Sequence, residues 1–425
     1  MARETNRYFK FDWITIIIFL LLIGFGWLNI LSASHVGDTI DYFNISQPYG
    51  KQLIFILLTF GLIVIILSIE AKFYERFSSI IYLASLLSLL GLFIFGKNVN
   101  GATSWYAIGS MTIQPSEFAK AATALAVAKY ISDLHTDINN LKDQLRIFIV
   151  IAIPALLILL QNDTGSTIVY GAFFFVLYRE GLPKFYLFFG LFLVFLSVSA
   201  LKFGPITTTI VVTVLVFAYR FLQKKKGYFL QSILVIISST ILVFGVKYVY
   251  SNLLPFHQKD RITIWLSLEK DPVKLNRMKQ TIAYNLNESE KAISSGGLTG
   301  RGFLEGTRTT GKFVPEQHTD YIFSTVGEEW GFVGSSAVVI LFVILIIRIL
   351  QLAELQKSQF SRVYGYSVAS IFFVHFMINV GMVMGLIPTI GIPLPFFSYG
   401  GSGLWGFTIL LFIFIKLDSN RINEW

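Results

Sequence analysis

The 425-residue chain contains no cysteine and little charge, since 14% of its residues are Asp, Glu, Lys or Arg whereas 54% are hydrophobic. Without cysteine there is no disulfide, no thiolate metal site and no cysteine nucleophile. A chain so poor in charge and so rich in apolar side chains lies outside the composition of soluble globular domains. The composition therefore predicts a polytopic membrane protein.

The formal net charge of +9 does not by itself indicate a nucleic-acid partner. The basic residues gather at the ends of apolar segments or in one long polar loop, a distribution typical of membrane topology and not of a basic soluble face. We therefore expect no nucleic acid among the partners.

Apolar runs divide the chain into about twelve predicted transmembrane helices. Because lipid offers the backbone no hydrogen-bond partners, these runs are expected to be helical, and the fold class to be all-α. We expect residues 1–425 to form a single membrane domain. The runs lie at 13–31, 51–69, 78–95, 116–131, 147–160, 165–178, 185–201, 206–222, 228–250, 321–347, 363–386 and 403–416.

Basic residues alternate between the connecting loops. Loops such as those holding Lys72 with Arg76, or Arg179 with Lys184, are rich in them, and the intervening short loops hold few. The positive-inside rule then places both termini in the cytoplasm and the polar loop at about 252–320 outside. Because structureless loops of this length are uncommon unless they bind, gate or react, we expect this loop to carry the catalytic group.

Three carboxylates outside the centres of the apolar runs are candidates for chemistry. Pro115 suits the first turn of a helix, which puts Glu117 and Lys120 three residues apart on one face. The pair is either a local cap and salt bridge, or it positions Lys120 toward an anionic head group. Asp163, in the sequence QNDTG, is either a turn or cap residue or part of a site.

Asp271 is the third candidate. Proline disfavours the helical conformation in the residue before it, so Asp271 is expected to mark a helix end, with its carboxylate pointing away. A carboxylate at a membrane surface, flanked by cations, suits a general base for a hydroxyl group. The simpler alternative is an Asp-Pro turn.

Other polar groups give weaker signals. Glu328 and Glu329 lie within an apolar run, where carboxylates are functional candidates, although a helix N-terminus would also explain them. The glycines at 296–306 indicate tight turns and match no phosphate-binding loop. One His with scattered carboxylates matches no metal motif, so we predict no protein-built metal site; a hard cation bridging a substrate phosphate is the alternative.

Six segments, in this order along nearly the whole chain, resemble the motifs of the SEDS family (shape, elongation, division and sporulation; FtsW, RodA and SpoVE), and more closely its RodA branch than its FtsW branch. They are QPSEFAK at 114–120, QNDTGS at 161–166, DP at Asp271, AISSGGLTGRGFLEGT at 292–307, PEQHTDYIFSTVGEEWG at 315–331 and GIPLPFFSYGGSG at 391–403.

The resemblance implies a peptidoglycan glycosyltransferase of the bacterial cytoplasmic membrane, joining lipid II disaccharide units into glycan strands for cell-wall elongation and shape. It implies Asp271 as the general base of an inverting transfer, with Lys120 and Arg261 on the pyrophosphate and Mg²⁺ or Mn²⁺ as a candidate cofactor. The residues expected to bind substrate are Trp105, Gln114, Glu117, Lys120, Asp163, Arg261, His318 and Ser398.

The partners that the resemblance implies are lipid II, a class B penicillin-binding protein and membrane proteins of the elongation complex. Two other functions remain open, a lipid II flippase and a non-catalytic scaffold for a transpeptidase. The chain departs from the family in two places. It has three apolar runs between 185 and 250 where the ten-helix family core has one, which predicts an extra pair of helices, and it carries an insertion after Pro272.

Overall fold

The structure is a computed structural model that describes residues 11–35, 41–99, 101–109, 111–223, 229–269, 271–281, 283–315 and 317–421. The chain divides into two compact units. The first comprises Met1–Leu182, Glu288–Met384 and Ile390–Trp425, and the second comprises Pro183–Asn287 and Gly385–Thr389.

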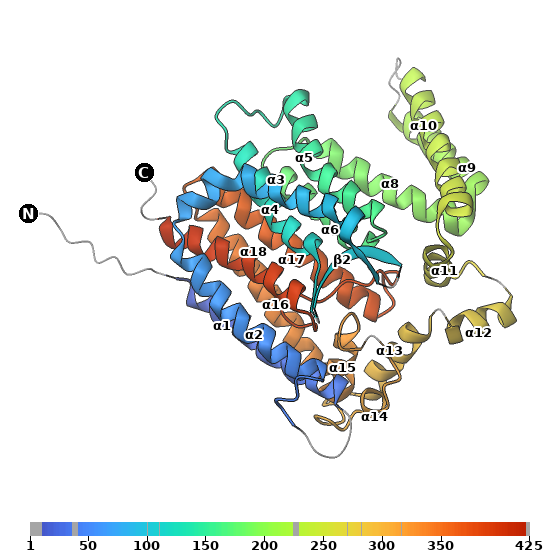
Figure 1. The fold of residues 1–425 in the computed structure, drawn as a ribbon. Coiled ribbons are helices and arrows are strands. Elements are labelled where there is room, and N and C mark those ends of the chain that lie inside the picture. Colours follow the sequence, from blue (N-terminus) through green and yellow to red (C-terminus); the bar gives the residue numbers. More distant parts are fainter. Residues whose placement is uncertain are drawn as a thin grey trace, which may run out of the picture. The chain divides into compact units, whose positions relative to one another are not determined.

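The first unit is a helical bundle built from both ends of the chain, together with a small sheet (Figure 1). Its elements are α1 (Trp13–Ser34), α2 (Pro48–Ser68), α3 (Ala71–Phe95), β1 (Lys97–Val99), β2 (Ala102–Ile108), β3 (Met111–Ile113), α4 (Pro115–Ile131), α5 (Leu141–Leu160), α6 (Thr164–Val169), the 3₁₀ turn η1 (Tyr170–Ala172), α7 (Phe173–Arg179), α14 (Thr307–Thr310), α15 (Ile322–Glu329), α16 (Gly331–Glu354), α17 (Gln359–Val383) and α18 (Gly401–Asn420). α13 (Tyr284–Ser295) begins in the residue range of the second unit and ends in that of the first.

Two C-terminal helices form the centre of the first unit. In their most apolar 18-residue stretches, 78% of α17 and 83% of α18 are buried within the protein, so both helices are enclosed by protein on most sides. α17 packs against α16 and α4, and α18 packs against α2 and α4, which brings the first and last parts of the chain together (Figure 1).

α4 is short, rich in alanine and buried along most of its length. Small side chains let helices approach closely where no hydrophobic effect separates protein from lipid. One close approach is at Gly406 of α18, where a Cβ atom would lie 2.9 Å from the carbonyl oxygen of Glu117. This contact fixes the first turn of α4, on which two of the predicted site residues stand.

Between α3 and α4 in the sequence lies a three-stranded antiparallel sheet in the order β1-β2-β3, while the two helices themselves pack against each other. Lys97 pairs with Trp105, and Tyr106 pairs with Ile113. The Tyr106 hydroxyl donates to the Ser88 carbonyl at 2.7 Å, which ties the sheet to α3. Hydropathy alone did not predict these strands, because they are short and mixed in polarity.

The glycine-rich run at 296–306 wraps the joint between α15 and α16. A Cβ at Gly300, whose φ is +83°, would clash with the Glu329 carbonyl, and Gly331, with φ of +62°, packs as closely against Gly300. Backbone hydrogen bonds from Phe332 to Gly297 and from Val333 to Leu298 close the wrap. The predicted tight turns are therefore present, and the glycines permit backbone-to-backbone contact.

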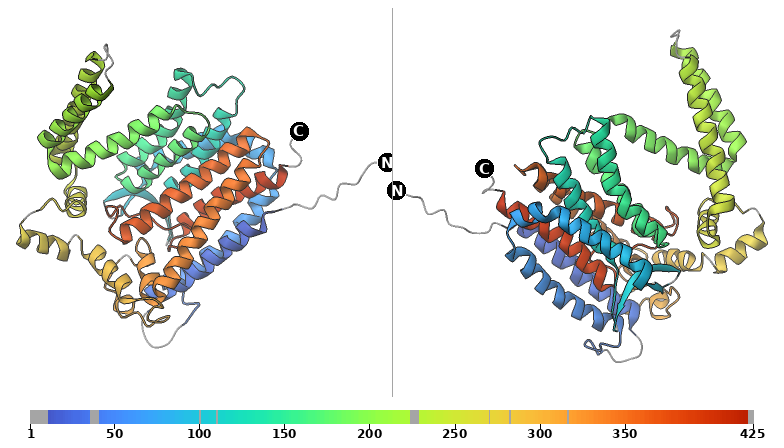
Figure 2. Two further views of the ribbon diagram at one scale, coloured as in Figure 1. Left: turned by 180° about the vertical axis from the view of Figure 1, so that it is seen from behind. Right: turned by 45° about the horizontal axis from the view of Figure 1, so that its top comes forward.

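The second unit contains three long apolar helices followed by shorter polar ones. Its elements are α8 (Lys184–Phe203), α9 (Pro205–Gln223), α10 (Phe229–Tyr248), the π-helical turn η2 (Val249–Leu253), α11 (Phe256–Trp265) and α12 (Pro272–Thr281). α9 and α10 lie side by side (Figure 2). The small core of this unit consists of Leu196, Ala200, Val212 and Val243.

The predicted all-α membrane fold is confirmed. Within the described residues, ten helices are long and apolar enough to cross a membrane: α1, α2, α3, α5, α8, α9, α10 with η2, α16, α17 and α18. The other two predicted runs are also helical, but α4 has 17 residues and the segment 164–179 is broken into α6, η1 and α7. The count of about twelve spans, the single membrane domain and the outside location of the 252–320 loop stay predictions.

Candidate active site

Gln114 and Pro115 begin α4 as the sequence predicts, at the N-cap and the first helical position. Proline costs nothing there, since the first-turn N–H groups have no partner within the helix. The Gln114 backbone N–H donates to Ser402 Oγ at 3.1 Å, and its Nε2 donates to Asp163 Oδ2 at 2.8 Å. Gln114 thus links the start of α4 to α18 and to the α5–α6 turn.

One turn further on, Glu117 and Lys120 form the predicted ion pair, with Nζ 2.8 Å from Oε2. The pair is enclosed in the protein, because the Lys120 side chain is 0% exposed and that of Glu117 is 3% exposed. Removing two charges from water costs several kcal/mol per ion, which only close pairing and further hydrogen bonds offset. The predicted salt bridge is thus present, but it lies in the protein interior and is not a cap at the surface.

His375 of α17 completes this cluster, and sequence analysis missed it. Its Nε2 lies 2.9 Å from Lys120 Nζ, and its Nδ1 lies 3.2 Å from the Pro393 carbonyl oxygen. Lysine only donates, so Nε2 accepts the hydrogen bond from Lys120, and the protonated Nδ1 donates one to the Pro393 carbonyl. The available signal was a histidine, with Asn379 one turn later, inside an apolar span, where polar side chains are functional candidates.

Side chains hold the non-helical segment 391–400 in place. Asn379 Nδ2 donates to the carbonyl oxygens of Asp320 and Ile392 at 2.8 and 2.7 Å. Ser398 is buried, its hydroxyl donating to the Thr319 carbonyl at 2.6 Å and accepting the Leu394 N–H at 2.9 Å. Ser398 therefore stabilises the conformation of this segment.

His318 and Trp105 are the two predicted ring-bearing site residues. The His318 ring lies 5.3 Å from that of Tyr399, and the His318 carbonyl accepts the Tyr399 N–H at 2.9 Å. Trp105 lies on β2 and is partly exposed. Both roles in substrate binding stay predictions.

Asp163 is the N-cap of α6, which agrees with the cap alternative. Its Oδ1 accepts the Ser166 N–H at 2.9 Å, and its Oδ2 accepts the Ser166 hydroxyl and the Gln114 amide, both at 2.8 Å. The preceding Asn162 has φ of +63°, a conformation that Asn tolerates better than most residues. Asp163 therefore orders the α5–α6 turn and the start of α4 together.

Arg261 lies on α11 in the second unit. Its Nη1 donates to the Thr389 carbonyl at 3.1 Å, and the Trp265 indole donates to the Leu386 carbonyl at 3.0 Å. These bonds attach α11 to the segment 385–389. A small pocket is lined by Arg261, Ile264, Trp265, Ala283, Leu286, Ile387, Pro388 and Thr389.

Asp271 does not mark a helix end as predicted, because α11 ends at Trp265 and Pro272 is the first residue of α12. Proline suits a first helical position, so the Asp-Pro pair starts a helix here. The carboxylate does not simply point away either, since Oδ1 accepts the Val273 N–H at 2.9 Å. Asp271 is partly exposed, and the predicted insertion after Pro272 forms α12.

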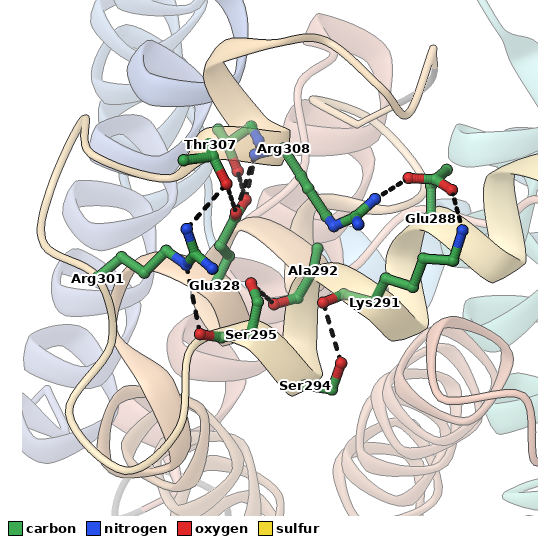
Figure 3. A network of polar contacts seen from close by, with 10 residues as sticks. Glu288, Lys291, Ala292, Ser294, Ser295, Arg301, Thr307, Arg308 and Glu328 are labelled. Atoms are coloured by element: carbon green, nitrogen blue, oxygen red, sulfur yellow. Dashed lines mark hydrogen bonds and ion pairs between the residues drawn. The ribbon is translucent and has the colours of Figure 1, made fainter.

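A second ionic network lies on α13 and α14 (Figure 3). Glu288, which is buried, binds Arg308 and also Lys291, the latter at 2.6 Å. Arg301 donates to Thr307 Oγ1 at 2.9 Å. This network stabilises the segment from α13 to α14 that leads into α15.

Glu328 and Glu329 lie at the C-terminal end of α15, so the N-terminus of their own helix does not explain them. Glu328 instead binds the N-terminus of α14, accepting the N–H groups of Arg308 and Thr309 at 2.9 and 2.8 Å. Glu329 precedes α16, the helix of membrane length, and is hydrogen-bonded by Ser32 of α1. Burial raises the pKa of Glu329 to about 7, and the neighbouring Glu328 charge adds to the shift.

The described residues contain no group of three or more His, Asp or Glu side chains arranged to hold a metal ion. The expectation of Mg²⁺ or Mn²⁺ as a cofactor stays a prediction.

Fold and site together define a polytopic helical membrane protein with a buried Glu117–Lys120–His375 cluster and a polar, largely helical loop. A family model described as cell cycle protein, covering FtsW, RodA and SpoVE, matches residues 12–209 and 183–423. The chain belongs to this family.

Among its relatives, the peptidoglycan glycosyltransferase RodA of Treponema pallidum is 30% identical over 97% of this chain and 98% of its own. The peptidoglycan glycosyltransferase MrdB of Escherichia coli K12 is 30% identical over 81% of this chain and 78% of its own.

Two solved structures share the fold. The chain matches a structure described as showing structural coordination of polymerization and crosslinking by a peptidoglycan synthase complex, with a TM-score of 0.73 and 23% identity over 98% of this chain and 100% of the other. It also matches the crystal structure of the rod shape determining protein RodA from Thermus thermophilus, with a TM-score of 0.62 and 22% identity over 98% and 99% of the two chains.

Proposed function

We propose that the protein is a peptidoglycan glycosyltransferase that joins lipid II disaccharide units into glycan strands during cell-wall elongation. The observation that carries this proposal is the 30% identity over almost the full length of both chains to a RodA named as such an enzyme. The fold, the order of the sequence motifs and the buried charged cluster agree with this assignment.

The reaction is an inverting displacement. The acceptor's sugar 4-hydroxyl attacks the anomeric carbon of the donor, the new C–O bond forms, and the bond to the lipid pyrophosphate breaks. The hydroxyl proton needs a base, and the departing pyrophosphate needs positive charge.

Asp271 is the proposed base. Its placement before Pro272 and the hydrogen bond from the Val273 N–H to its Oδ1 fix the carboxylate at the start of α12. A carboxylate has about four lone-pair sites, so it can also accept a hydroxyl proton. General-base catalysis contributes roughly 10²–10⁴-fold to a rate.

Lys120 and Arg261 are the proposed cations for the pyrophosphate. The Glu117 carboxylate and the His375 ring hold the Lys120 ammonium in one position, and Thr389 holds one of the five N–H donors of Arg261. Mg²⁺ or Mn²⁺ remains part of this proposal, with oxygen ligands supplied by the substrate pyrophosphate. Omitting the metal and adding EDTA in the polymerisation assay tests that part separately.

We further propose a cross-linking partner of the penicillin-binding class and membrane proteins of the elongation complex, with both termini in the cytoplasm. The likeness of this chain to a structure of a peptidoglycan synthase complex, in which polymerization and crosslinking are coordinated, supports such a partner.

The test is polymerisation of labelled lipid II by the purified full chain, with and without the cross-linking partner. Asp271→Asn is expected to lower the initial rate by roughly 10²–10⁴-fold, because it removes the base without changing the size of the side chain. Glu290→Gln is the matched control, since Glu290 is an exposed carboxylate of the same loop, and it is expected to retain the full rate.

An Asp271→Asn variant that polymerises at the normal rate would overturn the assignment of the base. A chain that moves lipid II across liposomes without making polymer would instead be a flippase. A chain that is silent alone, and whose Asp271→Asn variant supports its partner normally, would be a scaffold.

A further inference from the structure

An apolar groove of about 800 Å³ lies within the second unit, among α8, α9 and α10. Its walls are aromatic and aliphatic over most of their length, including Phe192, Phe195, Val211 and Leu215. The groove has the volume of a small-molecule site, about 300–1,000 Å³. These helices include the extra pair that the sequence predicts beyond the family core, and none of the residues proposed for the reaction lines the groove.

One end of the groove is polar and basic. Arg220, near the end of α9, lines it together with Gln231 and Ser232 at the start of α10. The Arg220 guanidinium lies 4.9 Å from the Phe229 ring centroid, which holds it against α10. Its Nη1 is buried and has no hydrogen-bond partner among the described residues. A buried donor on a permanent cation is costly without an acceptor, so this end is suited to an anion.

The groove has the length of one lipid chain. It extends along α9 from Thr207 to Arg220, which is about 20 Å at 1.5 Å per residue. One leaflet of a bilayer core is about 15 Å thick, half of the whole core. A single acyl chain can therefore occupy the apolar part while its phosphate stays beside Arg220.

We propose that this groove is a binding site for an anionic glycerophospholipid, with one acyl chain along α8 and α9 and the phosphate on Arg220. The predicted topology puts the Arg220 end in the cytoplasmic leaflet, away from the outer surface where the proposed polymerisation takes place.

The test is native mass spectrometry of the purified full chain with phosphatidylglycerol and phosphatidylcholine of identical acyl chains. One lysine or arginine near a membrane surface favours an anionic lipid by about fivefold, so we expect the first bound phosphatidylglycerol to bind about fivefold more tightly than phosphatidylcholine. Arg220→Gln is expected to remove the preference, and Arg220→Lys to retain most of it. Lys184→Gln is the matched control, because Lys184 is an exposed cation at the start of α8 that does not line the groove.

A second variant locates the acyl chain. Leu215 is 59% exposed and lines the groove, so Leu215→Trp fills the groove without entering the core, and it is expected to lower the affinity for both lipids. Equal affinities for the two lipids, or an unchanged preference in Arg220→Gln, would overturn the proposal. So would a photoreactive residue at position 215 that captures a polypeptide and no lipid in cells.

Discussion

Lys120 Nζ lies 2.9 Å from His375 Nε2, between side chains separated by 255 positions in the sequence. His375 in turn contacts the Pro393 carbonyl through Nδ1. The charged first turn of α4 is therefore connected through one imidazole to the non-helical segment before α18. A change in the position of either element must alter the surroundings of the Lys120 ammonium.

Replacing His375 tests this connection. His375→Leu removes the acceptor for Lys120 and the donor for Pro393, so we expect the free energy of unfolding to fall by about 1–3 kcal/mol. We expect the polymerisation rate to fall by roughly 10–100-fold, since small displacements in an active site have effects of that size. His375→Gln retains an amide donor and acceptor and is expected to recover part of both. A His375→Leu variant with normal rate and stability would contradict the connection.

The contribution of the Glu117–Lys120 pair to stability can be measured separately from its contribution to activity. Glu117→Gln leaves the buried Lys120 charge without its counter-ion, which is expected to cost about 3–5 kcal/mol of stability. The double variant Glu117→Gln/Lys120→Met removes the charge as well and is expected to be more stable than the single variant. The double variant is nevertheless expected to be inactive on lipid II, because the Lys120 ammonium is absent. Thermal unfolding in detergent and the polymerisation assay measure the two effects, and an active double variant would exclude a role for Lys120.

The raised pKa of Glu329 predicts that the stability of the protein depends on pH. Its pKa in the folded protein, about 7, is higher than the ordinary 4.5, so the folded state favours the protonated carboxyl. The stabilisation is complete below pH 4.5 and is lost as the pH rises through 7. The difference between the two pKa values corresponds to about 3 kcal/mol. We expect thermal stability to decrease between about pH 4.5 and pH 7, and Glu329→Gln to reduce that decrease; an unchanged slope in the variant would contradict this origin.

The glycine wrap around the α15–α16 joint gives a matched pair of substitutions. Gly300→Ala places a Cβ on a residue with positive φ and into the Glu329 carbonyl, so we expect it to cost at least about 2 kcal/mol. Gly245→Ala, in α10, meets no atom within 4 Å and is expected to be neutral or to stabilise by up to about 1 kcal/mol. Equal melting temperatures for the two variants would show that the wrap does not need glycine at position 300.

The sequence alone determined the class of fold, the family and the local ion pair. Apolar runs of membrane length must form helices in lipid, and the motif order extends over nearly the whole chain. The Glu117–Lys120 pair was predictable because residues three apart are neighbours on any helix. The start of α4 at Pro115 was predictable for the same local reason.

Only the tertiary structure decided which distant groups meet. It brought His375 to Lys120, Glu328 to the N-terminus of α14 and Asp163 to Gln114, because such contacts depend on how helices pack. It also put Asp271 at the start of α12, where the Asp-Pro pair had suggested a helix end. Both positions are possible because an Asp followed by Pro can stand after the end of one helix or directly before the first residue of another.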